Sequence, residues 1–240
     1  EQKYEIVFDN HNFLQYLQEH IPMNFAAIEI GSNAVRMIVA ELEDSCELRV
    51  IERWSSHLRL GDTVFECGEI SENIFQQLLH TIHGLLLEIK KFPQIKVSLS
   101  GTSAMRDANN SVEVVDRLKT LVEFPVKILS GIEESRCLLD GVQSFLPQSV
   151  LMKFPLRQTF LADLGGGSLE ISLLEPETNR TSNKTKNFQS FDIGTLRLRK
   201  IKNAIQQLES IIPDGLSQLS QVFSVNPEDR SHLILTGGNA

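Results

Sequence analysis

The stretch from Phe160 to Glu175, FLADLGGGSLEISLLE, constrains the fold of this 240-residue chain more than any other. Apolar runs flank Asp163 and a turn of three glycines, Gly165 to Gly167, which is followed by Ser168. Short apolar runs bounded by turn residues predict two strands joined by a tight turn. Without Cβ atoms, the backbone N–H groups of such a turn can converge on an anion, of which phosphate is the natural guest. An ordinary glycine-rich hairpin is the alternative for this stretch taken alone.

A second stretch near the start, Phe25 to Glu41, repeats the pattern of strand, acid, glycine and strand. Its acid is Glu29, and Gly31 to Asn33 form its turn. A third glycine turn ends the apolar stretch from Leu233 to Gly238. Two acid-x-Gly hairpins indicate an internal duplication. The trio resembles the phosphate-binding set of the superfold that contains acetate and sugar kinases, heat-shock chaperones and actin, in which two similar domains clamp a phosphate chain between facing hairpins.

The composition favours a soluble globular protein with a substantial core, since 41% of the residues are hydrophobic. No stretch approaches the roughly 20 apolar residues that span a bilayer, and the N-terminus lacks the features of a signal peptide, so we expect no membrane contact and a cytoplasmic location. Three cysteines without metal-ligand spacing fit unpaired thiols. A net charge of −8 argues against nucleic acid as a partner.

The order of predicted elements is that of a duplicated α/β unit. Residues 1–22 fit poorly with the rest and are interpreted as an N-terminal extension. The first half, 23–147, is predicted to contain strands at 24–31, 34–42, 47–57, 97–100 and 125–129, loops at 58–71 and 101–110, and helices at 72–91, 111–122 and from 131. The second half, 148–240, is predicted to contain the hairpin at 158–175, a polar loop at 178–187, strands at 188–193 and 231–236, and a helix near 201–212. The repeat would require another helix after Ala240, so the second half is expected to be truncated.

Six motifs make the resemblance more specific. IEIGSNAVRM, LRLGDTVFECGEIS, GTSAMRDANN, LSGIEESR, LADLGGGSLEI and DIGTLRLR occur in the order and spacing of the exopolyphosphatase and guanosine pentaphosphate phosphohydrolase (Ppx/GppA) family. The resemblance covers about residues 23–240. It implies an α/β fold of two ribonuclease H-like, actin-like ATPase domains, each a mixed five-stranded sheet with helices, and a cleft between them.

The resemblance also implies roles for the residues of these motifs. The expected catalytic residues are Glu134, Asp163, Glu170 and Arg106. Phosphate groups would be bound by Gly31, Ser32, Asn33, Arg36, Gly165, Gly166, Gly167, Ser168, Thr195, Arg197, Gly237 and Gly238. Mg²⁺ or Mn²⁺ would be held by Glu29, Asp163 and Glu170.

Two neighbouring glutamates can be separated by their positions on a helix. Ser130 and Glu133 have the spacing of a capping box, so Glu133 is interpreted as structural. Glu134 lies about 100° further round the same helix and cannot serve the same purpose. It matches the family's catalytic base, which aligns the water that attacks a terminal phosphorus.

The implied activity is release of orthophosphate from the end of polyphosphate, or of the 5′ γ-phosphate from guanosine pentaphosphate. The alternative is a non-catalytic protein that senses polyphosphate or a guanosine alarmone, but a sensor needs no water-activating base. Glu29 departs from the family pattern, which usually has aspartate there. The sequence leaves open which substrate is preferred and whether the chain forms a homodimer.

Overall fold

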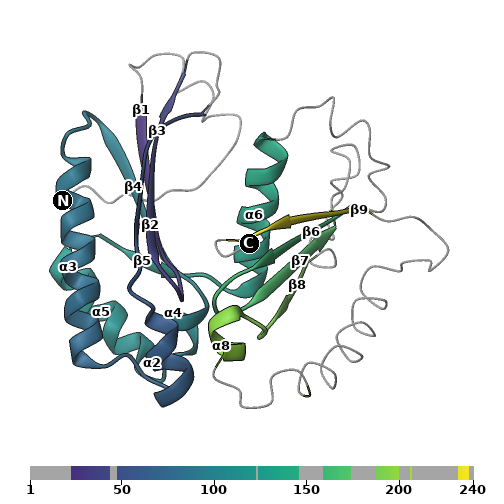
Figure 1. The fold of residues 1–240 in the computed structure, drawn as a ribbon. Helices are drawn as coiled ribbons and strands as arrows, with labels where there is room; N and C mark the ends of the chain where they lie inside the picture. The colour runs from purple at the N-terminus through teal and green to yellow at the C-terminus, as the bar shows by residue number, and fades with distance from the viewer. Residues whose placement is uncertain are drawn as a thin grey trace.

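The chain folds into two mixed β-sheets with helices packed against them, which confirms the predicted α/β class. A computed structural model describes residues 23–43, 48–122, 124–145, 159–173, 188–199, 206 and 232–237. The first sheet has five strands in the order β3-β2-β1-β4-β5, and the second has four in the order β8-β7-β6-β9. The two sheets lie side by side in Figure 1.

The first sheet combines an antiparallel meander with two parallel strands. Its strands are β1 (Met23–Ile30), β2 (Val35–Leu42), β3 (Leu48–Ser56), β4 (Ile95–Gly101) and β5 (Val126–Ile128). Strand β1 pairs antiparallel with β2 and parallel with β4, so it lies at the centre. Ala26, Ile28 and Ile30 alternate along β1 and are buried, as the period of two in a strand requires.

Helices cover one face of this sheet and complete the larger core. They are α2 (Leu60–Cys67), α3 (Glu72–Ile89), α4 (Ser103–Asp107) and α5 (Ser111–Val122). Helix α3 begins at the predicted N-cap, Ser71, whose side chain accepts a hydrogen bond from the Ile74 N–H. Its buried residues, Phe75, Leu78 and Ile82, recur at helical spacing and pack into the core. No helix in the described part of the chain is long and apolar enough to cross a membrane.

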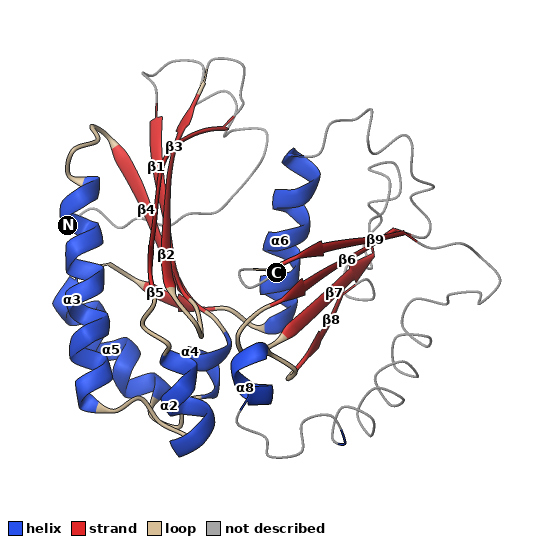
Figure 2. Cartoon of the chain, in the orientation of Figure 1, coloured by secondary structure: helices blue, strands red, loops and turns tan. Residues whose placement is uncertain are grey.

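The second sheet carries the glycine-rich hairpin. Its strands are β6 (Thr159–Leu164), β7 (Leu169–Leu173), β8 (Phe188–Phe191) and β9 (His232–Thr236). The short helix α8 (Thr195–Arg199) follows β8. Helix α6 (Gly131–Phe145), which we expected in the first half, packs against β7 and β8 instead (Figure 2). Leu139 of α6 joins Leu161 and Phe188 in a small core of their own.

Two of the predicted loops are helices. The loop predicted at 58–71 contains α2, because Leu60 and Val64 lie one turn apart and are both buried. The hydroxyl-rich loop predicted at 101–110 contains α4, which buries Ala104 and Met105. Both segments carry glycines or hydroxyl residues that favour loops, and the burial of their few apolar side chains outweighs that preference.

Most other elements agree with the sequence. The strands of both hairpins and the capped helices at 72–91 and from 131 are confirmed, with bounds within a few residues. The second sheet has four strands among the described residues, where five were expected. The extension at 1–22, the polar loop at 178–187 and, apart from residue 206, the helix near 201–212 lie outside the described residues.

Gly194 lies where the chain passes over the Gly165–Ser168 turn. The backbone N–H groups of Thr195 and Leu196 donate to the carbonyls of Gly165 and Gly166 at 3.0 and 2.8 Å. A Cβ atom at position 194 would overlap the backbone of Gly166 and Gly167, which no side-chain rotation can relieve. Only glycine permits this close approach of two backbone segments.

We therefore expect Gly194→Ala to lower the free energy of unfolding by roughly 1–3 kcal/mol, the usual cost of overpacking. Gly84→Ala is the matched control, because a Cβ at position 84, within α3, would meet no atom within 4 Å. The control should be neutral or stabilising by up to about 1 kcal/mol, since alanine favours a helix more than glycine does. Urea unfolding of both variants measures the difference, and equal stabilities would refute the close packing at Gly194.

Candidate active site

A polar cavity of about 100 Å³ lies where the two hairpins meet. Both hairpins and helix α6 contribute to its wall. It is lined by Glu29, Gly31, Ser32, Asn33, Arg36, Thr102, Ser103, Glu134, Asp163, Gly165, Gly166, Gly167 and Ser168. The volume suits a phosphoryl group with a few waters, and the wall is more polar than apolar.

The two hairpin turns have the same construction. The Gly31 N–H donates to the Ala34 carbonyl at 3.0 Å, and the Gly165 N–H donates to the Ser168 carbonyl at 2.9 Å. In both hairpins the acid stands two residues before the first glycine, which supports the duplication inferred from the sequence. The turns also pack together, because a Cβ at Gly166 would lie 3.2 Å from the Ser32 Cβ and 3.3 Å from the Asn33 nitrogen.

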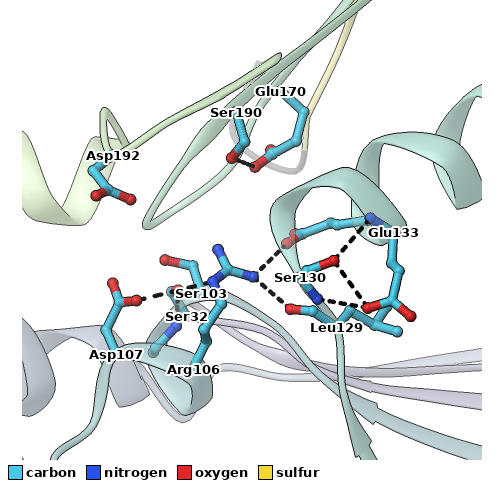
Figure 3. Close-up of polar contacts among 12 residues, drawn as sticks. Ser32, Ser103, Arg106, Asp107, Leu129, Ser130, Glu133, Glu170, Ser190 and Asp192 are labelled. Carbon is cyan, nitrogen blue, oxygen red and sulfur yellow. Dashed lines mark hydrogen bonds and ion pairs between the residues drawn. The ribbon is translucent and has the colours of Figure 1, made fainter. Parts of the chain in front are cut away.

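Glu134 reaches the cavity from the first turn of α6 and is held by the guanidinium of Arg106 on α4. Arg106 Nη1 donates to the Leu129 carbonyl at 2.7 Å and to Glu134 Oε2 at 3.3 Å. Figure 3 shows the Arg106 guanidinium directed toward Leu129 at the start of α6. Arg106 lies on α4, so this contact joins the helix layer of the first sheet to a helix that packs on the second.

Burial, followed by the nearby carboxylate of Glu170, raises the pKa of Glu134 to about 7, although Arg106 acts in the opposite direction. Glu133 behaves in the opposite way. Its carboxylate forms the predicted capping box with Ser130 and an ion pair with Lys127 at 2.8 Å. These contacts lower the pKa of Glu133 to about 2. The two neighbouring glutamates therefore differ as the sequence predicted, one capping a helix and one titrating near neutrality.

Two further carboxyl groups line the cavity, one from each hairpin. Burial raises the pKa of Glu29, and repulsion from Asp163 raises it too, whereas Arg36 lowers it. Arg36 Nη1 lies 3.7 Å from Glu29 Oε2. Asp163 accepts a hydrogen bond from Thr236 Oγ1 at 2.9 Å. The cavity thus collects negative charge that one lining arginine offsets only in part.

Glu170 lies just behind the cavity wall and is almost fully buried, with 1% of its surface exposed. It accepts a hydrogen bond from Ser190 Oγ at 3.0 Å (Figure 3). Burial raises the pKa of Glu170, and its hydrogen bonds with Ser168 and Ser190 lower it. Glu170 therefore supports the Ser168 end of the turn and repels the Glu134 carboxylate.

The structure brings most of the predicted phosphate-binding residues together, but not all. Thr195 Oγ1 donates to the Gly165 carbonyl at 3.4 Å, so it contacts the turn but does not line the cavity. Arg197 and Gly237 do not line the cavity, and Gly238 lies outside the described residues. Sequence reasoning assigned no site role to Thr102 and Ser103, which do line it. The GTSAMR motif could have indicated these two site residues, because its hydroxyl groups directly follow a parallel strand, β4.

The carboxyl groups meet the requirements of a magnesium site only in part. No cluster of three or more His, Cys, Asp or Glu side chains that could hold a metal occurs among the residues that the structure describes. Glu29 and Asp163 are close enough to affect each other electrostatically, and both line the cavity. Mg²⁺ usually binds through one or two carboxylates with waters and substrate phosphates, so these two side chains fit it, with Glu170 outside the first layer of ligands.

Comparisons with known proteins identify relatives of this chain. A sequence model of the Ppx/GppA phosphatase family matches residues 37–225. A Haemophilus influenzae protein, named provisionally as an exopolyphosphatase, is 25% identical over 146 residues, which are 61% of this chain and 43% of that protein. The chain thus spans less than half the length of this relative.

Solved structures show the same fold. A Cytophaga hutchinsonii exopolyphosphatase is similar with a TM-score of 0.73 and 22% identity, over 89% of this chain and 66% of that one. The Aquifex aeolicus member of the Ppx/GppA family is similar with a TM-score of 0.66 and 24% identity, over 90% of this chain and 66% of that one.

The raised pKa of Glu134 predicts how stability depends on pH. The folded protein holds the Glu134 proton up to about pH 7, whereas the unfolded chain releases it near 4.5. The stability that this proton contributes is complete below 4.5 and is lost as the pH rises through 7. Glu134→Gln removes the effect, so the variant should gain roughly 1–3 kcal/mol relative to wild type between pH 5 and pH 8.

Glu133→Gln is the control on the adjacent residue. The lowered pKa of Glu133 gives stability that is complete above about 4.5 and is lost only as the pH falls toward 2. Its stability relative to wild type should therefore stay constant between pH 5 and pH 8. Urea unfolding at several pH values compares the variants, and equal pH dependence in both would contradict the raised pKa of Glu134.

Proposed function

The chain belongs to the Ppx/GppA phosphatase family, and on that basis we propose that it is a phosphohydrolase. It removes the terminal phosphate of inorganic polyphosphate, the 5′ γ-phosphate of guanosine pentaphosphate, or both. The observation that carries the proposal is the Glu134 carboxyl, held by Arg106 at the wall of a cavity lined by two glycine turns. A general base is most effective when its pKa lies near the working pH, and burial raises the pKa of Glu134 to about 7.

In the proposed reaction, Glu134 accepts a proton from water as the water oxygen attacks the terminal phosphorus. The bond from that phosphorus to its bridging oxygen breaks, and the shortened chain leaves with the bonding electron pair. Orthophosphate and a chain shorter by one phosphate are the products. Such a transfer depends mainly on positioning and on neutralising charge, because the protein forms no covalent bond to the phosphorus.

The cavity wall supplies the positioning. The glycine turns offer backbone N–H groups, and Ser32, Thr102 and Ser103 offer hydroxyl groups to phosphate oxygens. Arg36 contributes positive charge from the first hairpin. Arg106 contacts Glu134 and the start of α6, so its part is to orient the base.

Glu29 and Asp163 would hold Mg²⁺ or Mn²⁺, which when bound would neutralise the negative charge of substrate and cavity. The two carboxylates lie on different hairpins, and both line the cavity that would receive the phosphates.

Glu134→Gln should lower kcat for phosphate release by roughly 10²–10⁴, the range expected for the loss of a positioned general base. KM should change little, because the amide keeps the size of the side chain. Glu133→Gln should leave kcat near the wild-type value, since that carboxylate caps α6 outside the cavity. Phosphate release from polyphosphate and from guanosine pentaphosphate measures both variants.

Equal rates in the two variants would exclude Glu134 as the base. Binding of either compound by the wild type without any release of phosphate would instead favour the non-catalytic sensor.

Turnover should also require a divalent cation. Without one, Glu29 and Asp163 would repel a polyphosphate chain from a cavity whose lining, among the described residues, includes one arginine. Excess chelator should therefore abolish phosphate release while circular dichroism and the unfolding midpoint stay unchanged, and added Mg²⁺ should restore the rate. Full activity in chelator would exclude this role for the two acids.

A further inference from the structure

Arg197 lies at the junction of the two halves but outside the cavity, and its contacts reach both of them. Its Nε donates to the Gly167 carbonyl at 2.9 Å, within the glycine turn of the second sheet. Its Nη2 forms a hydrogen-bonded ion pair with Asp107 of α4. Its guanidinium also lies 4.2 Å from the centre of the Phe65 ring on α2. One side chain thus joins the turn to two helices of the first half.

We propose that Arg197 is a positioning residue that fastens the Gly165–Ser168 turn to helices α2 and α4 and so fixes the width of the cavity. A planar guanidinium suits this task, because its N–H groups point in fixed directions while its face stacks on an aromatic ring. Asp107 balances its charge, so the guanidinium serves the protein rather than a phosphate. This assignment replaces the phosphate-binding role expected from the sequence.

Residues beside these contacts line the cavity or contact Glu134, so a small displacement of Arg197 would also displace the proposed catalytic residues. Gly167 and Ser103 both line the cavity, and Arg197 Nη2 lies 3.5 Å from Ser103 Oγ. Asp107 directly follows Arg106, which holds Glu134. Loosening Arg197 would therefore move the glycine turn relative to the base on the other side of the cavity.

The backbone around Arg197 supports the same function. The Arg197 and Leu196 N–H groups donate to the Gly166 carbonyl at 3.3 and 2.8 Å. A Cβ at Gly61 of α2 would lie 3.2 Å from Leu196 Cδ1, so α8 packs against α2 as well. The segment from Gly194 to Arg197 is thus bound to the turn by its backbone and to the first half by its side chains.

The expected effect of substituting Arg197 on the rate of phosphate release rests on the proposed function. The expected effect on the distance between the glycine turn and the first half does not, so both are measured. Arg197→Ala should lower kcat for phosphate release roughly 10–100-fold with little change in KM, because a displacement of about 1 Å can cost that much in a positioned reaction. Arg199→Ala is the matched control: it removes the same charge from the same helix, at an exposed side chain outside the cavity. It should behave as wild type.

Geometry is measured with spin labels at Val112→Cys on α5 and Leu233→Cys on β9, both exposed, after replacement of the chain's three cysteines by serine. The wild type and Arg199→Ala should give one narrow distance distribution, and Arg197→Ala a broader one. Arg197→Lys keeps the charge but offers a single nitrogen, so it should be intermediate in both measurements. A folded Arg197→Lys or Arg197→Ala protein with wild-type distances would overturn the proposal. If the wild type releases no phosphate, the proposed function fails, and the distances alone decide the role of Arg197.

Discussion

Repulsion among carboxyl groups that line or adjoin one small cavity is the constraint on which the site depends. Glu29, Glu134 and Asp163 line one small cavity, and Glu170 lies just behind it. Burial and mutual repulsion raise the pKa values of three of them, Glu29, Glu134 and Glu170. Bringing these carboxyl groups together costs stability, and carboxyl groups with such perturbed pKa values cluster at functional sites. Here it would leave Glu134 able to accept a proton near neutral pH and attract a cation that brings in phosphate.

The fold holds these acids together by connections between the elements packed on its two sheets. Arg106 joins α4 to α6, Arg197 joins the glycine turn to α2 and α4, and Gly194 lets one backbone pass closely over another. Each connection contacts a cavity-lining residue: Arg106 contacts Glu134, Arg197 contacts Gly167, and Gly194 lies against Gly166. The position of α6 has a direct consequence, because a helix that follows the first sheet in the chain packs on the second and carries Glu134 to the junction.

The sequence predicted what depends on local pattern. Both hairpins, the Ser71 cap and the contrast between Glu133 and Glu134 follow from turn residues, capping spacing and the helical period. It missed α2 and α4, whose glycine and hydroxyl residues favour loops when only local preference is weighed. It could not assign α6 to the second sheet or Arg197 to a structural role, because both depend on contacts between residues far apart in the chain.

The pH dependence of kcat/KM for phosphate release from polyphosphate tests the central assignment most directly, because it reports the ionisation of the free enzyme. We expect a rise with an apparent pKa near 7, the value to which burial raises the pKa of Glu134. The residual activity of Glu134→Gln, measured over the same range, separates this rise from the substrate's own ionisation and should lack it. A wild-type profile that is flat above pH 5, or a variant profile with the same rise as the wild type, would contradict Glu134 as the base.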